Sequence, residues 1–346
     1  MRIALVSTMR TSVPPPRAGS VELLVALLAE ELQRRHHHVT VFAPGDSKVG
    51  TRVLSVLTSG YHHDRTIWDW RLAEFMQLGL AYEHAREFDL IHSHVYCYAL
   101  PFARLVEVPT VHTLHICPTP EIVRYCRMYP EGRYVLISEF QRGFFEDVPV
   151  AGVVHNGIDT RAFPFSARAD GYLAFIGDLR PDKGPLEAIR AARTAGIPIR
   201  IAGPATEYFA QAIKPELDGR SVEYVGELGH EGKVALLGGA IATIFPSTGL
   251  EACPLVLMES MACGTPVVGL SQGPVPEIVA QGVGGIHVED ARSLAPAIER
   301  VQSLDRAGVR RLAVERFDVS RMVDGYVRVF ERALGGGRAW RRQAGR

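Results

Sequence analysis

Short apolar segments and segments of helical periodicity alternate along the first half of the chain. Residues 2–7 form an apolar run, residues 21–35 repeat apolar positions at helical spacing, and residues 38–42 are rich in β-branched side chains. Further buried strands are predicted at 89–92, 109–112, 134–137 and 152–155. Strands that alternate with helices are typical of a parallel α/β sheet.

The second half repeats this alternation after a segment without periodicity at 159–171, which we interpret as a linker. Its predicted strands are 172–176, 199–202, 222–225, 240–245, 266–268 and 285–288. The pattern predicts two doubly wound α/β domains that face one cleft. Ligands of such sheets bind beyond the carboxyl ends of the strands, so a functional site is expected in the loops that follow strands.

Length and charge balance narrow the class of protein. The chain has 346 residues, enough for two domains, and its 38 Lys and Arg balance 38 Asp and Glu. We expect no nucleic-acid partner, because such partners are captured by an excess of positive charge. The longest apolar run near the N-terminus, residues 23–29, is far shorter than the roughly 20 residues of a membrane span. We therefore expect no transmembrane segment and a cytoplasmic location.

Three smaller features of the composition add detail. Five cysteines without any Cys-x-x-Cys pair fit reduced thiols. The chain has 34 arginines but only four lysines, a bias that codon usage explains more simply than function. The last residues, 335–346, hold four arginines and no acid. We expect a solvated end there, with a weak peripheral contact to phosphate or anionic lipid as the alternative.

The segment at 245–268 carries the most chemistry. Pro254 suits the first turn of a helix and Gly264 suits its end, which predicts a helix of about ten residues. The helix body is apolar on every side except at Glu259 and Ser260, so it should be buried. An ionised glutamate is costly there unless a partner hydrogen-bonds it. Glu259 is therefore either a ligand-binding residue or one half of a buried structural salt bridge.

A second glutamate, Glu251, precedes this helix. It lies eight residues before Glu259, an axial separation of about 12 Å at 1.5 Å per residue. That separation suits two hydroxyl-rich groups joined by a diphosphate, whose phosphates would meet the free N–H groups of Leu255 and Val256. The alternative for Glu251 is an acid that stabilises the start of the helix.

The loop at 177–184 is a second phosphate candidate, because it follows the first predicted strand of the second half. Gly177 permits a tight turn, and Lys183 can reach a terminal phosphate as a point charge. Solvated loop charges would explain the same residues.

The loop at 14–22 is a third phosphate candidate. Gly19 and Ser20 open a helix there, so backbone N–H groups and a hydroxyl could meet an anion. The alternative is an ordinary serine N-cap with Glu22 in the first turn. The loop is not Gly-x-Gly-x-x-Gly, which argues against a nicotinamide site.

Histidines and cysteines gather at the ends of two predicted strands: His92, His94, Cys97, His112, His115 and Cys117. A zinc site is the alternative interpretation, but no spacing matches a known ligand pattern and the histidine pairs lie on separate strands. We expect His92 and His112 to be buried with backbone partners. His115 falls at the carboxyl end of its strand, where a cleft residue belongs.

These segments together resemble the family 4 retaining glycosyltransferases of the GT-B fold. The specific part is the pair Glu251 and Glu259, separated by seven residues in the segment PSTGLEACPLVLMESMACGTPVV. Weaker matching segments occur in order along the chain: the loop before Glu22, 38–43, 138–139, 155–159, 177–184 and 274–277. The fold class implied is α/β, with two Rossmann-like doubly wound domains facing a central cleft.

The resemblance divides the chain into three regions. Residues 1–160 would form an N-terminal Rossmann-like domain that binds the acceptor, and residues 161–318 a C-terminal Rossmann-like domain that binds the nucleotide-sugar donor. Residues 319–346 would form a helix that crosses back to the N-terminal domain, followed by a basic tail.

The implied activity is transfer of a sugar from a nucleotide diphosphate sugar, expected to be a UDP- or GDP-sugar, to a hydroxyl of a small-molecule or glycan acceptor. The anomeric configuration would be retained. The nucleotide sugar is a co-substrate, and neither a cofactor nor a metal is expected. The implied catalytic residues are His115, Glu251 and Lys183. The implied donor-binding residues are Gly19, Ser20, Gly177, Arg180, Lys183, Gly226, Leu228, Glu251, Pro254, Leu255, Val256 and Glu259.

The resemblance also assigns roles within this set. Glu259 would hold the ribose hydroxyls, Glu251 the donor sugar near its 3-hydroxyl, and Lys183 the diphosphate. His115 would lie beside the donor sugar, and the loop at 226–228 would contact the base. Because Glu251 then acts on a remote hydroxyl, departure and attack on the same face are favoured over a double displacement.

Three departures from the family pattern keep other interpretations open. Asp178 stands where the family usually has Arg, with Arg180 two residues on; Ser20 replaces a glycine; and Cys253-Pro254 replaces Phe-Gly, so that one N–H is lost. The alternatives are a GT-B nucleotide-sugar epimerase or phosphorylase, or a catalytically inactive nucleotide-sugar-binding relative.

The acceptor is not specified by the sequence. The aromatic-rich segments at 61–70 and 96–98 are expected to line its site, because rings suit a flat or sugar-like partner.

Overall fold

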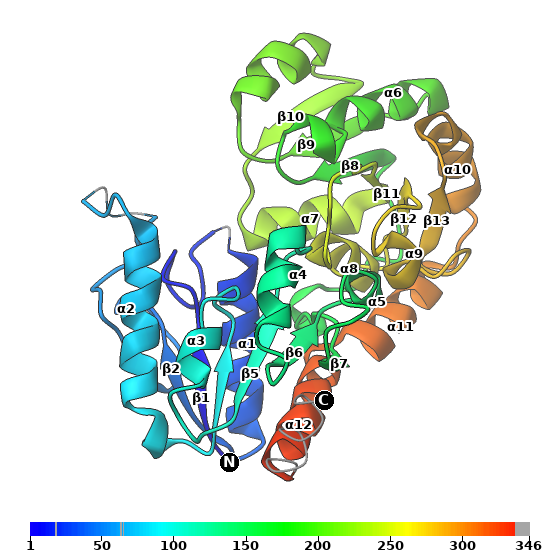
Figure 1. Ribbon diagram of the computed structural model, residues 1–346. Helices are drawn as coiled ribbons and strands as arrows, with labels where there is room; N and C mark the ends of the chain where they lie inside the picture. The colour runs from blue at the N-terminus through cyan, green and yellow to red at the C-terminus, as the bar shows by residue number, and fades with distance from the viewer. Residues whose placement is uncertain (18, 63, 65, 336–346) are drawn as a thin grey trace. The chain divides into compact units, whose positions relative to one another are not determined.

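The chain folds into two compact units in a computed structural model that describes residues 1–17, 19–62, 64 and 66–335 (Figure 1). Unit 1 comprises Met1–Gly157 and the chain from Val319 onward, and unit 2 comprises Ile158–Asp318. The basic segment at 336–346 lies outside the described residues. Among the described helices, none combines the length and the apolar composition that crossing a membrane requires.

Unit 1 is built on a sheet whose described strands, seven in number, are all parallel and follow the order β3-β2-β1-β4-β5-β6-β7. The strand β1 lies inside the sheet, between β2 and β4, and its residues 3–6 are wholly buried, as the unbroken apolar run predicts. The strands are β1 (Arg2–Val6), β2 (His38–Phe42), β3 (Arg52–Leu54), β4 (Leu90–Ser93), β5 (Thr110–Leu114), β6 (Arg133–Leu136) and β7 (Val150–Val153).

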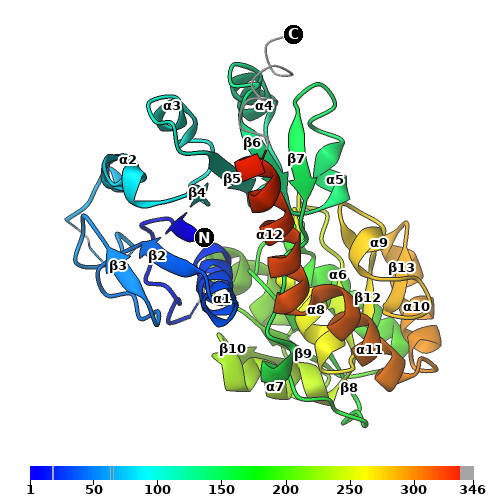
Figure 2. The ribbon, with the colours of Figure 1, turned by 90° about the horizontal axis from the view of Figure 1, so that it is seen from below.

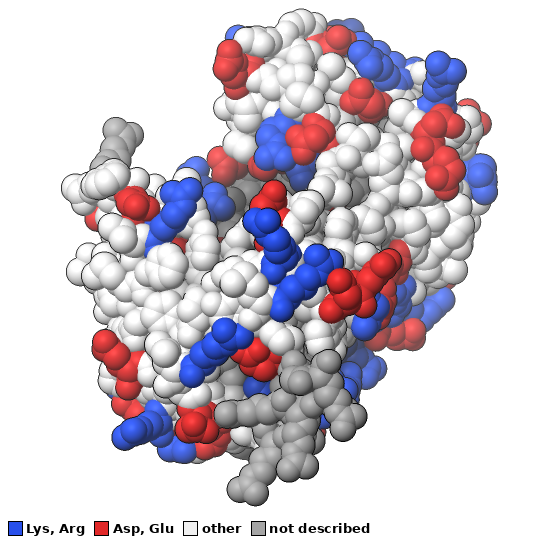
Figure 3. Space-filling model, viewed as in Figure 1, with Lys and Arg blue, Asp and Glu red and all other residues white. Residues whose placement is uncertain are grey.

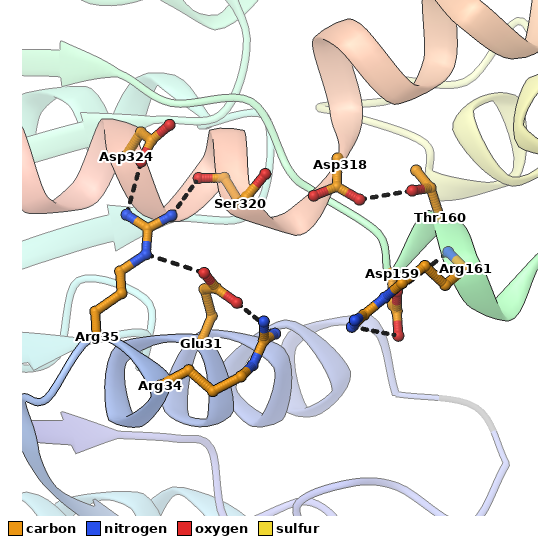
Figure 4. A network of polar contacts seen from close by, with 9 residues as sticks. All are labelled: Glu31, Arg34, Arg35, Asp159, Thr160, Arg161, Asp318, Ser320 and Asp324. Carbon is orange, nitrogen blue, oxygen red and sulfur yellow. Dashed lines mark hydrogen bonds and ion pairs between the residues drawn. The ribbon is translucent and has the colours of Figure 1, made fainter.

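Helices cover this sheet, and the last helix of the chain belongs to the same unit. The helices of unit 1 are α1 (Ser20–Arg34), α2 (Trp70–Glu83), α3 (Leu100–Ala103), α4 (Pro120–Arg127), α5 (Glu139–Arg142) and α12 (Val319–Gly335). The helix α12 packs beside α1 (Figure 2) and buries one face that includes Met322, Tyr326 and Phe330. Its polar face is used as well, because Arg35 donates to Asp324 at 2.7 Å and to the carbonyl of Ser320 at 3.0 Å (Figure 4).

Unit 2 has the same plan, with described strands in the order β10-β9-β8-β11-β12-β13, again all parallel. These are β8 (Tyr172–Ile176), β9 (Ile199–Ala202), β10 (Val222–Gly226), β11 (Ala240–Phe245), β12 (Val267–Leu270) and β13 (Gly285–Val288). Its helices are α6 (Pro185–Ala195), α7 (His230–Gly239), α8 (Leu255–Ala262), α9 (Val275–Ile278), α10 (Leu294–Val301) and α11 (Arg306–Phe317).

The two ends of unit 2 are tied to each other. The N–H of Ile158 donates to the carbonyl of Phe317 at 2.9 Å, and the hydroxyl of Thr160 donates to Asp318 at 2.6 Å (Figure 4). The residues where the chain enters and leaves unit 2 therefore lie side by side.

On the face shown in Figure 3, acidic and basic side chains are interspersed, in keeping with the zero net charge.

Two strands, β7 and β3, depart furthest from the sequence prediction, and bounds shifted by one or two residues occur at β1, β4, β5, β6, β10 and β12. The strand β7 spans Val150–Val153, two residues before the predicted 152–155. The strand β3, Arg52–Leu54, was not predicted, because three partly exposed residues at a sheet edge carry no period-two signal.

Candidate functional site

In unit 2, the loops that follow β8 and β11 meet at the point where the strand order reverses. These strands are neighbours, but β9 lies on one side of β8 and β12 on the far side of β11. The carbonyl of Asp182, after β8, accepts from the N–H groups of Thr248 at 2.8 Å and Gly249 at 3.1 Å, after β11. A side chain at Gly184, whose φ is +72°, would lie 2.6 Å from the carbonyl oxygen of Pro246. The two loops are therefore in close backbone contact at the switch point, where ligands of such sheets bind.

This contact places the predicted phosphate lysine against the predicted sugar glutamate. The Nζ of Lys183 donates to Glu251, and the two side chains are 22% and 18% exposed. Lys183 ends a short 3-10 turn, Pro181–Lys183, that directs it back toward β11. The sequence separates these residues by 68 positions, so the fold is what pairs them.

The second motif glutamate, Glu259, also has a lysine partner. It lies in the middle of α8 with only 4% of its surface exposed, and the Nζ of Lys233 on α7 donates to it at 2.5 Å. The salt bridge that the sequence offered as one alternative for Glu259 is therefore present. The partner was not predicted. Two of the four lysines of the chain contact the two motif glutamates, a pattern that codon usage does not explain.

The helix α8 starts one residue after the proline that was expected in its first turn, and a residue of α11 contacts its other end. Its eight residues begin at Leu255, with Pro254 at the N-cap position and no side-chain cap in the described structure. The N–H groups of its first turn, those of Leu255 and Val256 among them, have no partner within a helix by geometry. Arg310 of α11 donates to the carbonyl of Ala262 at the other end.

The remaining predicted residues of unit 2 lie on the same edge of the sheet. Gly177 follows β8, and Gly226 ends β10 with a φ of +82°. Leu228 packs against the apolar cluster around Tyr172. Arg180 forms an exposed ion pair with Asp182 at 2.7 Å, which lowers the pKa of that carboxyl.

Asp178 stays on the surface beside this ion pair. Arg180, the cation that the sequence offers in place of the usual arginine, is thus held by a different acid, Asp182.

In unit 1, the loop after β1 closes on a glycine that tolerates no side chain. Gly19 has a φ of +155°, and a Cβ there would lie 2.8 Å from Pro15 and 2.9 Å from Glu22. The helix α1 starts at Ser20 with Gly19 as its N-cap and no side-chain cap bond in the described residues. The serine N-cap that we considered is therefore wrong. Glu22 is buried and accepts from the hydroxyl of Thr8.

A second buried carboxyl group braces the same loop. Both oxygens of Glu74, on α2, accept from the N–H of Met9, at 3.0 and 3.1 Å. Burial raises the pKa of Glu74 to about 8, with the nearby Glu22 adding to the shift. At neutral pH this group is mostly a neutral acid.

The carboxyl ends of β4 and β5 bring two histidines into contact. The Nδ1 of His94 lies 2.9 Å from the Nε2 of His115, and the rings are stacked with centroids 5.2 Å apart. Burial lowers the pKa of His115 to about 4 and lowers that of His94 well below its usual value. We expected the histidine pairs to be apart because they lie on separate strands. That expectation is wrong, because β4 and β5 are neighbours in the sheet.

The buried histidines differ from expectation in their partners. His92 bonds the hydroxyl of Thr113 at 2.7 Å, where we expected a backbone group. The Nδ1 of His112 is buried without a partner among the described residues. No group of three or more His, Cys, Asp or Glu in the described part of the chain is arranged to hold a metal ion.

The two aromatic segments of unit 1 are linked through α2. The ring of Tyr98 stacks on Phe75 at 5.5 Å and lies 5.3 Å from Tyr96, and the ring of Tyr61 lies 6.0 Å from Trp70. Trp70 and Phe75 are 36% and 41% exposed. Residues 63 and 65 of the first segment lie outside the described residues. The result is an aromatic surface that starts at the predicted acceptor segments and continues onto the helix.

Two family models together match residues 21–310. The description "Glycosyltransferase Family 4" matches residues 21–162, and "Glycosyl transferases group 1" matches residues 159–310. The chain belongs to glycosyltransferase family 4. The Glu251 and Glu259 block lies inside the second match, where the resemblance places it.

Curated relatives and solved structures agree with this family. The chain is 26% identical over 375 residues to a glycogen synthase of Mycobacterium tuberculosis, covering 91% of this chain and 89% of that one. It is 27% identical over 376 residues to a phosphatidyl-myo-inositol mannosyltransferase of Mycolicibacterium smegmatis, covering 97% and 95%.

Among solved structures, AviGT4, a glycosyltransferase involved in avilamycin A biosynthesis, matches with a TM-score of 0.73 and 24% identity over 97% of this chain and 98% of its own. Anabaena HepE, solved with UDP and glucose, matches with a TM-score of 0.71 and 18% identity over 96% and 99%. The family 4 chain therefore has the predicted GT-B architecture.

Proposed function

We propose that this family 4 glycosyltransferase transfers a sugar from a UDP- or GDP-sugar to a hydroxyl acceptor with retention of configuration. The observation that carries the proposal is the contact of Lys183 with Glu251 at the switch point of unit 2. A cation for the diphosphate and an acceptor for sugar hydroxyls are held side by side beyond the strand ends. HepE was solved with UDP and UDP-glucose, which makes uridine nucleotides the first donors to test.

The donor is proposed to span the carboxyl edge of unit 2. Glu259 would accept from the ribose hydroxyls, the first turn of α8 would bind the diphosphate through its N–H groups, and Lys183 would leave Glu251 for a phosphate oxygen. Glu251 would then accept from the donor sugar. The further donor contacts proposed are Gly177, Arg180, Gly226, Leu228 and Pro254, with Gly19 and Ser20 from unit 1.

The chemistry follows from charge development. The bond between the anomeric carbon and the diphosphate breaks, the acceptor oxygen forms the new bond on the same face, and the acceptor proton passes to the leaving phosphate. Negative charge grows on that phosphate, where Lys183 and the helix N–H groups stabilise it. The proposed transfer uses no protein nucleophile, cofactor or metal.

The proposed role of His115 is a neutral hydrogen bond to the donor sugar. Because burial keeps its pKa near 4, the imidazole carries no charge at neutral pH. It can accept from or donate to a hydroxyl but cannot deliver a proton as an imidazolium. The acceptor is proposed to lie on the aromatic surface of Tyr61, Trp70, Phe75, Tyr96 and Tyr98, whose rings suit a sugar or a flat aglycone.

A donor panel tests this function. The protein is incubated with UDP-, GDP-, ADP- and dTDP-sugars, with and without candidate alcohols, and release of nucleoside diphosphate is followed. We expect release from a UDP- or GDP-sugar that accelerates with an acceptor, and NMR of the product should show the donor's anomeric configuration. An inverted product would disprove the mechanism, and donor binding without release would favour a nucleotide-sugar-binding protein. Isomerised donor, or donor made from phosphate, would identify an epimerase or a phosphorylase.

Paired substitutions test the site. Glu259→Gln should weaken binding of bare nucleoside diphosphate, whereas Glu251→Gln should spare that binding and lower turnover. Glu299→Gln, on the exposed face of α10, is the matched control. Wild-type binding and turnover in both motif variants would show that the site is elsewhere.

A further inference from the structure

The pairing of Glu259 with Lys233 raises a question that the family motif does not answer. Glu259 lies in an apolar helix, and its side chain is 5% exposed. A carboxylate in such a place is strongly disfavoured unless a cation or several hydrogen bonds accompany it. Among the described residues, the hydrogen-bond partner of the carboxylate is Lys233.

Lys233 is placed so that it holds this carboxylate. It projects from the first turns of α7, its side chain is 23% exposed, and its Nζ lies 5.5 Å from the centroid of the Phe163 ring. The bond reaches Oε1 of Glu259, and a carboxylate has about four lone-pair directions on its two oxygens. The geometry thus holds the carboxylate in one orientation while leaving acceptor capacity for a ligand.

The helix α11 packs against α8, and its arginines bind carbonyl groups. On α11, Arg306 donates to the carbonyls of Ser166, Ala240 and Gly238, and Arg310 to those of Phe163, Ala262 and Thr160. Burial raises the pKa of the Cys263 thiol to about 11, so it is neutral. His230 on α7 bonds the carbonyl of Ala162.

We propose that Lys233 is a positioning residue that makes the nucleotide site select ribose over 2′-deoxyribose, by holding the carboxylate of Glu259 in the orientation that accepts from both hydroxyls of the diol. The inference rests on the proposed function, because it takes Glu259 as the ribose ligand. An ionised carboxylate accepts two O–H bonds, whereas a protonated one offers fewer acceptor positions and a donor. A 2′-deoxy nucleotide loses one of these charge-assisted bonds and leaves part of a buried carboxylate unsatisfied.

The experiment measures the ratio of dissociation constants for 2′-deoxy-UDP and UDP, with 2′-deoxy-GDP and GDP in parallel. The proteins are the wild type, Lys233→Met, Lys233→Arg, Glu259→Gln and Lys214→Met. Lys214 is an exposed lysine of the same unit and serves as the matched control. Thermal melting of each variant reports whether it remains folded.

We expect the wild type and Lys214→Met to prefer the ribonucleotide by about 10- to 100-fold. Lys233→Met and Glu259→Gln should bring the ratio to within about threefold of unity, and Lys233→Arg should recover part of it by restoring the charge. A purely structural salt bridge would lower both affinities together and leave their ratio unchanged.

The failures of the two proposals are distinguishable. If the wild type binds neither UDP nor GDP, the proposed function falls and this inference falls with it. If the wild type binds UDP but shows no preference for ribose, or if folded Lys233→Met keeps the wild-type ratio, the inference is overturned while the proposed function stands.

Discussion

The two units share one topology but differ in charge at the corresponding sheet edge, where unit 2 has charged groups and unit 1 has neutral ones. Each is a parallel sheet whose order reverses beside its first strand, between β1 and β4 in unit 1 and between β8 and β11 in unit 2. At that edge, unit 2 holds two lysine–glutamate pairs. Unit 1 holds groups that burial keeps neutral, the histidines 94 and 115 with lowered pKa values and Glu74 with a pKa raised to about 8.

The difference indicates which chemical groups of the substrates each unit suits. An ion pair that is about one-fifth exposed can exchange one partner for a ligand of the same charge, since the remaining partner is not left bare. A neutral imidazole or carboxylic acid offers directional hydrogen bonds without attracting an ion. We therefore expect unit 2 to take the charged diphosphate and unit 1 to take neutral hydroxyl groups.

Removing a charge from unit 2 should have the largest effect on activity. We expect Lys183→Met to lower kcat/KM about 100- to 1,000-fold, the range found when one preorganised stabilising group is removed from a transition state. The loss should appear in kcat more than in KM if the lysine moves fully onto the leaving phosphate. Steady-state kinetics with the donor found in the panel measures it, and Lys214→Met controls for loss of a surface lysine. An effect below tenfold would mean that the lysine stabilises the folded protein and not the leaving phosphate.

The neutral groups of unit 1 should instead make its stability depend on pH. The folded pKa of His112 is about 3 because of burial, below its usual 6.5, so the unfolded chain binds a proton that the folded chain does not. Stability is therefore full above pH 6.5 and falls with decreasing pH, by about 1.4 kcal/mol per pH unit for each such histidine. We expect His112→Gln to flatten this slope by about that amount, measured by urea unfolding between pH 6.5 and pH 5.

Glu74 provides the opposite sign as a control. Its folded pKa of about 8 lies above the usual 4.5, so the folded chain holds a proton that the unfolded chain loses, and stability falls as pH rises between these values. Glu74→Gln should thus steepen the slope that His112→Gln flattens. If the pH slope of stability in both variants equals that of the wild type, the two groups are charged in the folded state.

The aromatic surface of unit 1 should affect the acceptor alone. Phe75→Ala removes an exposed ring that stacks on Tyr98. We expect the acceptor KM to rise about 5- to 10-fold, since stacking contacts contribute about 1 kcal/mol, while donor hydrolysis without acceptor stays unchanged. Leu105→Ala, which truncates another exposed apolar side chain of the unit, is the control. A change in donor hydrolysis would contradict the division of labour between the units.

The sequence predicted the inner strands of both sheets better than the two edge strands of unit 1. The inner strands β2, β8, β9 and β11 have the predicted bounds, because apolar runs between turn residues specify a strand buried on both faces, and the edge strand β13 matches as well. At β7 the apolar residues continue beyond the last ladder pair at Val153, so the pattern alone placed the strand too late.

Side-chain partners were the part of the site that the sequence could not supply. Glu251 and Glu259 stand out because their spacing is local, whereas Lys233 lies on a different helix and contacts Glu259 across 26 positions. Likewise the contact of His94 with His115 depends on β4 and β5 being neighbours. The scarcity of lysine was the available signal, and it was attributed to codon usage.

The smallest effect should come from the one acid that departs from the family pattern. Asp178 is exposed, so its repulsion of a diphosphate is screened by water and salt. We expect Asp178→Asn to tighten UDP binding less than twofold and Asp178→Arg about threefold, with the gain shrinking as salt is raised. Arg180 is already paired with Asp182, so a new cation at 178 adds to the site without displacing it. A gain above tenfold that persists in high salt would mean that Asp178 faces the phosphates directly, and that the charge balance of unit 2 is set by this residue as much as by its lysines.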